Sequence, residues 1–226
     1  MNKEQAVENL DTVITNVEAA RLSLSDHHIV KIVAISKYNN EEDIQTLYEA
    51  GQRAFGENKV QDLKSKSEVL DDTPIEWHFV GRLQKNKINN LIDLNPSLNH
   101  SLDSLELAYE LDKKLEAKNR KMNCLLQINS ALEDSKAGVS PVDAINIYEE
   151  IYNNCKNINL KGVMSIGAHV DNEEAVKSSF ETTKKIFDDL KDKKAKYCSM
   201  GMSSDYELAI QSGSNMIRVG STLFKS

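Results

Sequence analysis

Short runs of apolar, β-branched residues alternate along the chain with longer stretches in which apolar residues recur every three or four positions. The clearest run covers residues 29–37, where Ile and Val dominate and the last residue is Lys37. Its length and composition predict a strand that is buried on both faces, as in a parallel sheet. Further strands are predicted at 53–56, 76–80, 98–101, 123–129, 160–166, 196–200 and 215–219, and the one at 98–101 is the least apolar.

The stretches between these strands have helical periodicity, and one additional helix, over 2–22, precedes the first strand. Strict alternation of strands and helices implies parallel strands joined by right-handed crossovers. Eight such units in roughly 200 residues suit a compact barrel. The sequence therefore predicts an α/β protein with a (β/α)8 TIM barrel, an extra N-terminal helix and a single domain over 1–226. An open, doubly wound sheet is the alternative.

Charge and cysteine usage narrow the class of protein. The net charge of the 226 residues is -7 and no basic block is present, which argues against nucleic acid or an anionic membrane as the partner. Three widely spaced cysteines form neither a disulfide framework nor a metal signature. The sequence contains no apolar run of about 18 residues and no signal peptide. A cytoplasmic protein without a bound metal is expected.

Lys37 is the candidate nucleophile. In a barrel of this kind the functional site lies at the carboxyl ends of the strands, where the first strand places Lys37 on the same face as Val33 and Ile35. A free lysine has a pKa near 10.4, and burial or a neighbouring cation such as Arg218 would lower it. A lysine activated in this way forms a Schiff base with a carbonyl compound. The alternative is a lysine at the rim that extends into water.

Two glycine- and serine-containing segments follow the last two strands and predict a phosphate site. The first contains Ser199, Gly201, Met202 and Ser203, and the second contains Arg218, Gly220 and Ser221. Glycine allows close backbone approach, serine adds hydroxyl donors, and the guanidinium fork of arginine matches phosphate oxygens. Two alternatives remain open: a capping box from Ser204 to Glu207, and an ion pair between Arg218 and a core carboxylate.

Asn58 and His78 follow or occupy the second and third strands, and both are candidate site residues. The five histidines are scattered and form no metal-binding set. His78 is therefore interpreted as a hydrogen-bonded residue within or behind the site rather than as a catalytic base. No residue is assigned a catalytic role.

Several motifs occur in an order that resembles one family. They are A-I-S-K at 34–37, F-G-E-N at 55–58, W-H-F-V-G-R-L-Q-K-N-K at 77–87, S-M-G-M-S-S-D at 199–205 and I-R-V-G at 217–220. This set resembles the pyridoxal phosphate homeostasis proteins. The resemblance implies a barrel like the alanine racemase N-terminal domain, with pyridoxal 5′-phosphate (PLP) held as an internal aldimine on Lys37. It also implies phosphate contacts from Ser199–Ser204 and Arg218–Ser221, and a pocket asparagine at Asn58.

The same resemblance favours a protein that binds, buffers or delivers PLP, with apo-forms of PLP enzymes as recipients. The alternative is a PLP-dependent amino-acid racemase. In barrel-type racemases the second catalytic base comes from an added β-domain, and this chain ends six residues after Gly220. A third interpretation is an aldolase that forms a Schiff base without a cofactor. A monomer or weak dimer is expected.

Overall fold

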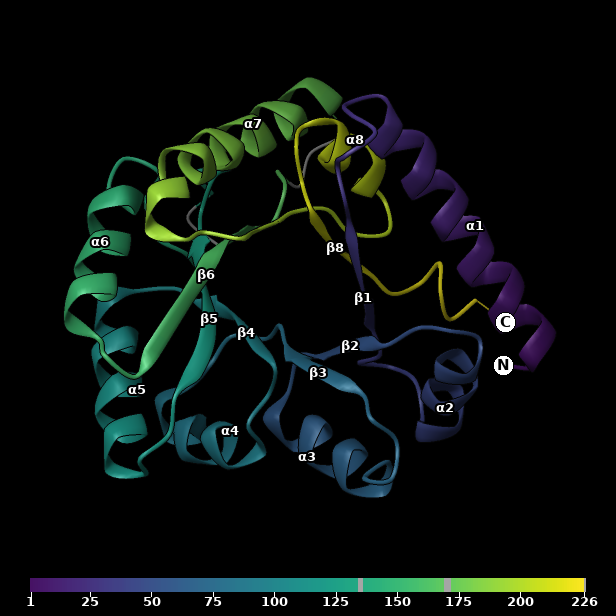
Figure 1. Cartoon of the computed structure of the whole chain (residues 1–226), viewed down its shortest axis with the longest axis horizontal. Helices are drawn as coiled ribbons and strands as arrows, with labels where there is room; N and C mark the ends of the chain where they lie inside the picture. The colour runs from purple at the N-terminus through teal and green to yellow at the C-terminus, as the bar shows by residue number, and fades with distance from the viewer. Residues whose placement is uncertain (134–135, 169–171, 226) are drawn as a thin grey trace.

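Eight parallel strands close into a barrel in the order in which they occur along the chain (Figure 1). The computed structural model describes residues 1–133, 136–168 and 172–225. The barrel closes between the first and last strands, where Val33 pairs with Arg218. The predicted TIM barrel is therefore confirmed over the open sheet. The strands are β1 (Lys31–Ile35), β2 (Ala54–Glu57), β3 (Glu76–Phe79), β4 (Leu98–Leu102), β5 (Met122–Ile128), β6 (Ile158–Ser165), β7 (Tyr197–Ser199) and β8 (Met216–Val219).

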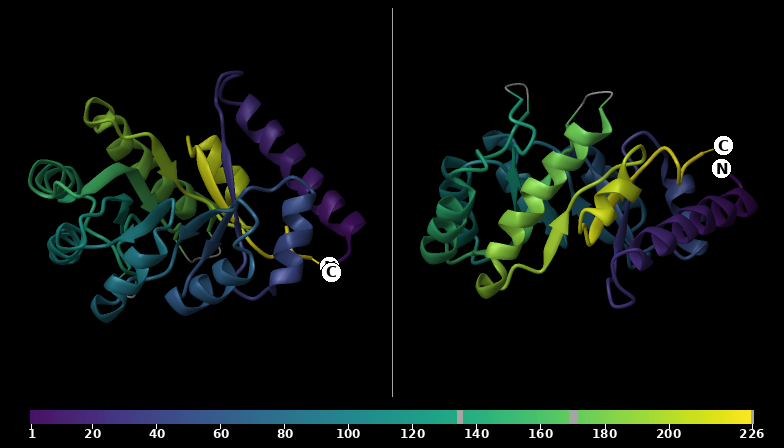
Figure 2. Two further views of the ribbon diagram at one scale, coloured as in Figure 1. Left: turned by 60° about the horizontal axis from the view of Figure 1, so that its bottom comes forward. Right: turned by 90° about the horizontal axis from the view of Figure 1, so that it is seen from above.

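Helices surround the barrel on the outside, as Figures 1 and 2 show from different directions. They are α1 (Lys3–Leu22), α2 (Glu41–Glu49), α3 (Val60–Val69), α4 (Ile88–Leu94), α5 (Leu105–Ala117), α6 (Ala144–Asn154), α7 (Glu173–Asp189) and α8 (Tyr206–Gln211), with short 3-10 turns at Lys85–Lys87 and Lys191–Lys193. The predicted extra N-terminal helix is α1. Within the described ranges, no helix is both long and apolar enough to cross a membrane.

The first apolar run is longer than the strand that it forms. Strand β1 begins at Lys31, and Ile29, which the sequence places in the strand, is 82% exposed. The amide of Lys31 donates to the carbonyl of Asn215, the residue before β8. Strand pairing of β1 therefore starts at Lys31. The carboxyl end also differs, because β1 ends at Ile35 and Lys37 lies in the turn that follows. The segment before β8 therefore sets the first limit, and a turn closed by the bond from the Asn39 amide to the Ser36 carbonyl sets the second.

Strand β4 forms although its sequence is the least apolar of the eight. All five of its residues are buried. Two of the three polar side chains in its centre have a partner: Asn99 accepts from the amide of Ser101, and the ring of His100 lies 2.8 Å from that of His78, whereas the Ser101 hydroxyl has no partner among the described residues. Burying a polar group costs much less free energy when the group has a hydrogen-bond partner than when it has none. The interior of the barrel thus stabilises a strand that local pattern defines weakly.

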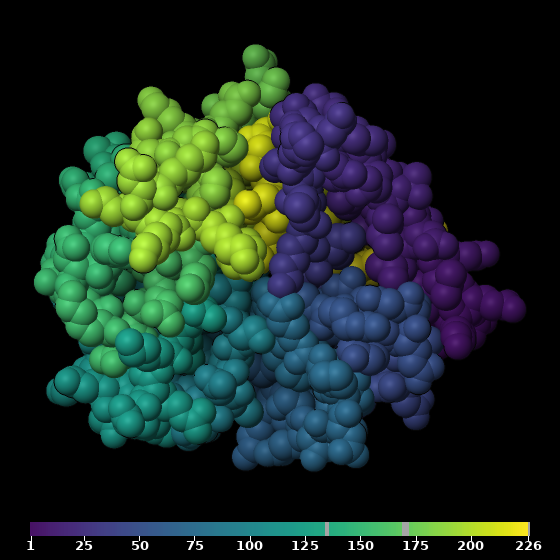
Figure 3. Space-filling model, viewed as in Figure 1, coloured from purple at the N-terminus to yellow at the C-terminus, as the bar shows by residue number. Residues whose placement is uncertain are grey.

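Helix α1 joins the beginning and end of the chain. The side-chain amide of Asn9 donates to the carbonyl oxygens of Leu223 at 3.2 Å and Lys225 at 2.8 Å. Asn16 donates to the hydroxyl of Tyr206 at the start of α8. The two termini therefore lie close together (Figure 2), and α1 (purple) occupies one edge of the molecule in the space-filling view (Figure 3). This packing holds the segment after β8, which borders the site described next.

Candidate functional site

A cavity of about 790 Å³ opens at the carboxyl ends of the strands, within the size range of small-molecule sites. It brings together most of the residues that the sequence singles out, although they are far apart in the chain. Its wall also contains apolar side chains from β1, β6 and the loops. The lining residues are Ile35, Lys37, Tyr38, Asn39, Asn58, Val80, Gly81, Met164, Ile166, Met202, Ser203, Ser204, Arg218, Gly220, Ser221 and Phe224.

Lys37 lies at this cavity two residues after β1, on the side that Ile35 also lines. Its ammonium group is 4.8 Å from the centre of the Tyr38 ring, and no carboxylate among the described residues pairs with it. The preceding residue is firmly held, because the Ser36 hydroxyl donates to Glu57 at 2.6 Å and Lys66 donates to the Ser36 carbonyl at 2.8 Å. The backbone next to Lys37 is therefore held in place, while its amine can contact a ligand.

The buried pair Glu57 and Lys66 makes this anchoring possible, and the motifs of the sequence do not predict it. Lys66 donates to Glu57 at 2.7 Å, and the Glu57 side chain is fully buried. A signal exists in hindsight, because Lys66 shares the buried face of α3 with Val60 and Leu63 at helical spacing. A lysine on that face requires a buried acceptor. Sequence alone does not say that the acceptor lies beside Ser36.

Asn58 follows β2 and lines the cavity, where its backbone packs directly against Gly81. A Cβ atom added to Gly81 would lie 1.8 Å from the carbonyl oxygen of Asn58. Only glycine allows this approach between the loops after β2 and β3.

We therefore expect Gly81→Ala to lower the free energy of unfolding by roughly 2 kcal/mol or more, because one of the two backbones must move. Gly56→Ala is the matched control, since its nearest neighbour is the side-chain methyl of Ile35 at 2.8 Å, which can rotate. Urea unfolding of both variants measures the difference. Equal losses would contradict the close contact between Gly81 and Asn58.

The loops after β7 and β8 are joined to each other at the rim. The amide of Gly220 donates to the Ser203 hydroxyl oxygen at 3.0 Å, so the hydroxyl hydrogen of Ser203 remains available for a ligand. In the described part of the chain, the amides of Ser203, Ser204 and Ser221 have no acceptor. These groups provide several donors on one side of the cavity.

The alternative of a capping box from Ser204 to Glu207 is not observed. Helix α8 has Asp205 at its N-cap without a side-chain cap bond, and Asp205 instead accepts from the amide of Met202 at 2.6 Å. The Met202 amide is therefore occupied. The turn is closed by Asp205, which leaves the serine hydroxyls free of a capping role.

Ser199 and Gly201 lie behind the cavity wall rather than on it. Gly201 has a φ of +92°, and a Cβ there would lie 2.7 Å from that of Ala209, so the position requires glycine for packing. Its carbonyl accepts from the amide of Arg218 at 3.0 Å. Ser199 is fully buried and contacts the Arg218 side chain. Both residues therefore support the cavity wall from behind, whereas the sequence predicts that they line the site.

Arg218 points into the barrel interior and reaches the cavity floor while remaining 6% exposed. One nitrogen donates to the carbonyl and hydroxyl oxygens of Ser199 at 3.0 and 2.7 Å, and the other donates to the carbonyl of Ser165 at 2.9 Å. Burial lowers the pKa of Arg218 to about 10, so it remains a cation at neutral pH. No described carboxylate lies within ion-pair distance, so the alternative of a core ion pair is not observed.

His78 does not reach this cavity. It is buried in β3, with Nδ1 2.8 Å from Nε2 of His100 and Nε2 3.1 Å from a carboxylate oxygen of Glu76. It borders a different cavity of about 340 Å³, which lies among the first residues of several strands. The level of His78 within the barrel explains this position, since Val80, two residues later on the same face, lines the upper cavity instead.

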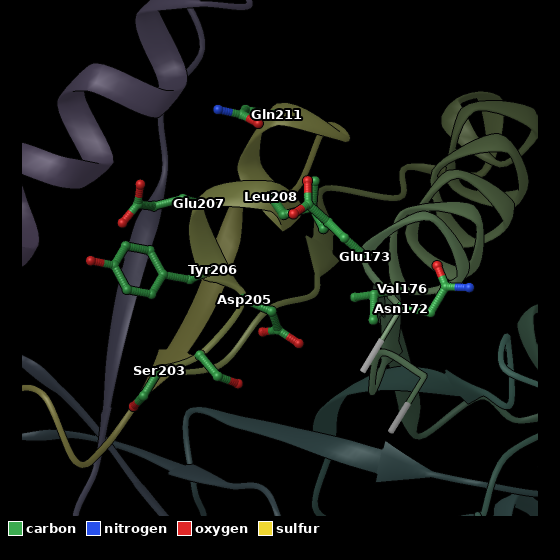
Figure 4. A pocket seen from close by; sticks show the side chains of 10 residues that line it. Asn172, Glu173, Val176, Ser203, Asp205, Tyr206, Glu207, Leu208 and Gln211 are labelled. Carbon is green, nitrogen blue, oxygen red and sulfur yellow. The ribbon is translucent and has the colours of Figure 1, made fainter. Parts of the chain in front are cut away.

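A neighbouring cavity of about 610 Å³ lies between α7 and the loop after β7, and it shares Ser203 and Ser204 with the Lys37 cavity. Figure 4 shows Asp205 between Ser203 on one side and, on the other, Val176 of α7 and Asn172, the N-cap residue of that helix. Three carboxylates, those of Glu173, Asp205 and Glu207, line this space. Their negative charge disfavours an anion there. An anionic ligand is better accommodated on the Lys37 side of the serine loop.

The family model described as alanine racemase, N-terminal domain, matches residues 9–226, which places the chain in this class of barrel. The pyridoxal phosphate homeostasis protein of Helicobacter pylori strain 26695 is 54% identical over 218 residues, covering 96% of this chain and 97% of the relative. The protein of the same name from Mus musculus is 34% identical over 207 residues, covering 86% and 76%. The chain therefore belongs to the alanine racemase N-terminal domain family and, within it, to the pyridoxal phosphate homeostasis proteins. The resemblance seen in the motifs is confirmed.

Solved structures agree with this assignment. PipY of Synechococcus elongatus PCC7942, with PLP bound, is 29% identical with a TM-score of 0.82, covering 97% of this chain and 99% of that one. Alanine racemase of Clostridium difficile 630 is 16% identical with a TM-score of 0.74, and this chain spans 56% of its length. The second likeness concerns the fold alone.

Proposed function

We propose that this protein binds PLP in the Lys37 cavity and takes part in the intracellular homeostasis of that cofactor. PLP supplies an aldehyde that condenses with an amine, together with a ring and a phosphate dianion. The observation that carries the proposal is the cavity itself, which brings together around one space Lys37, hydroxyl and amide donors, and a buried arginine; neither Lys37 nor the amide donors have a partner among the described residues. PipY, with a TM-score of 0.82 to this chain, has been solved with PLP bound.

Within this site each element has a separate task. Lys37 would form the covalent bond to the aldehyde carbon, because Ser36 beneath it is anchored and its amine has no competing carboxylate. Ser203, Ser204, Gly220 and Ser221 would hold the phosphate from the rim, and Arg218 would add positive charge from the floor. Asn58 and Met202 would contact the ligand from two sides. Ser199 and Gly201 would act through the wall behind them.

We further propose that the protein holds PLP rather than using it for catalysis, with apo-forms of PLP enzymes as recipients in the cytosol. The whole chain, 1–226, would form the single PLP-binding domain. Among the described residues at the cavity, the titratable side chains other than Lys37 are Arg218, which is charged, and Tyr38, which is 86% exposed. Neither is a buried base of the kind that racemisation requires on the opposite face of the ligand. The racemase remains the competing interpretation.

One experiment tests the proposal on the purified protein. Addition of PLP should turn it yellow, and borohydride, which reduces a carbon–nitrogen double bond, should then attach the cofactor permanently to the peptide that contains Lys37. A colourless protein that forms a Schiff base only with other carbonyl compounds would favour the aldolase instead. Racemisation of a common amino acid at about 1 s⁻¹ or faster would overturn the non-catalytic assignment.

A further inference from the structure

Below the cavity, a row of polar side chains runs through the barrel interior toward its opposite mouth. The Arg218 guanidinium contacts the Ser199 hydroxyl at 2.7 Å, and that hydroxyl lies 3.4 Å from Nδ1 of His100, the longest contact in the row. Nε2 of His100 is 2.8 Å from Nδ1 of His78, and Nε2 of His78 is 3.1 Å from Glu76. Ser199, His100 and His78 are fully buried. The row therefore connects the ligand cavity with the cavity at the strand starts.

Burial favours the neutral form of both imidazoles in this row. Burial is the main cause that lowers the pKa of His78, and it also lowers the pKa of His100 well below its usual value. Each ring therefore has one N–H donor and one acceptor nitrogen. Glu76 is ionised, because its hydrogen bond with His78, followed by that with Lys31, lowers its pKa to about 2.

These constraints determine the direction of every hydrogen bond. Ionised Glu76 can only accept, so a neutral His78 must donate to it from Nε2 and accept on Nδ1. Ser199 accepts from Arg218 and directs its own hydrogen to the acceptor that remains, Nδ1 of His100. His100 then carries its proton on Nε2 and donates to Nδ1 of His78, which in turn donates from Nε2 to Glu76. Glu76 also accepts from Lys31 at 2.5 Å. All donors along the row point from Arg218 toward the Glu76 carboxylate.

We propose that Ser199, His100 and His78 form a one-directional hydrogen-bond chain that positions Arg218 beneath the ligand, with Glu76 as its remote carboxylate anchor. This role rests on the proposed function, since Arg218 then faces PLP. Hydrogen bonds in a series polarise one another when they are buried in a medium of low dielectric constant. The negative charge of Glu76 therefore strengthens the acceptor that holds Arg218, although the two residues lie at opposite ends of the barrel. Ser199, His100 and His78 are positioning residues in this proposal.

The direction of the chain can be measured without any cofactor. Long-range proton–nitrogen NMR correlation of protein labelled with 15N-histidine distinguishes protonated from unprotonated ring nitrogens, and single substitutions of His78 and His100 assign the signals. We expect both rings to be neutral at pH 7 and to carry the proton on Nε2. A proton on Nδ1 of either ring, or a charged ring, would overturn the chain. This result stands independently of whether the protein turns yellow with PLP.

The positioning role is tested by a double-mutant cycle with PLP affinity as the readout. Glu76→Gln retains an acceptor oxygen but removes the charge, and Ser199→Ala breaks the chain next to Arg218. We expect each change alone to weaken PLP about three- to tenfold. In the Ser199→Ala background, Glu76→Gln should cause no further loss, because the chain no longer reaches Arg218.

Glu106→Gln serves as the matched control, since it removes an exposed carboxylate that pairs with Lys85 outside this row. It should leave PLP affinity unchanged in both backgrounds. Additive losses from Glu76→Gln and Ser199→Ala, or an unchanged affinity in Glu76→Gln, would overturn the positioning role, because a purely structural role predicts independent effects. A wild-type protein that fails to bind PLP would overturn the proposed function and this role together, whereas the NMR result would still decide the chain.

Discussion

Lys37→Ala is expected to abolish the yellow colour that PLP gives to the protein. The covalent bond requires the amine of Lys37, which is the only lysine among the described residues that line the cavity. Lys66, buried beside Ser36, already donates to Glu57 and Ser36. Alanine leaves the phosphate donors at the rim unchanged, so weaker non-covalent binding should persist. An absorption spectrum with equimolar PLP measures the loss of the band, and equilibrium dialysis measures the remaining binding.

Lys59→Ala is the matched control, because Lys59 follows Asn58 but borders a separate cavity. Its spectrum should equal that of the wild type. A visible band that persists unchanged in Lys37→Ala would contradict the assignment of the nucleophile. Borohydride treatment followed by peptide mapping would then identify the lysine that takes its place.

Arg218→Ala is expected to weaken PLP binding by about ten- to a hundredfold, the range for a hydrogen bond to a charged group. The change removes a buried cation from the cavity floor. The low local dielectric constant there makes the attraction between opposite charges stronger than at the surface. Because the proposed contact is to the phosphate, pyridoxal, which lacks that group, should lose much less affinity. Titration of both ligands, monitored by absorption, gives the comparison.

Arg82→Ala controls for the loss of a positive charge, since its side chain is 78% exposed and its nearest carboxylate is Asp103 at 3.5 Å. Unfolding should be followed in parallel, because Arg218→Ala leaves the carbonyl oxygens of Ser165 and Ser199 without this donor. Equal losses for PLP and pyridoxal would assign the guanidinium to the ring of the ligand rather than to its phosphate.

Local pattern was sufficient where a feature depends on neighbours in the sequence. The alternation of apolar runs with amphipathic stretches predicts the order of all eight strands, and the barrel geometry then places Lys37 and Ser203 at one end. Local pattern does not predict the position of a residue that depends on contacts with other strands. His78 was expected at the site, but its level within the barrel is set by its pairing with β2 and β4, and it lies beneath the cavity.

By itself, the sequence determined the class of fold, the lysine at the end of the first strand, and the serine and arginine segments that mark the family. These follow from periodicity and motif, which are properties of residues close together in the chain. Tertiary structure alone decided that Lys66 and Glu57 anchor Ser36, that Ser203 is joined to Gly220, and that Arg218 faces a chain of buried histidines. The physical reason is that buried polar groups must find partners in space, and barrel closure brings together partners that no spacing in the sequence reveals.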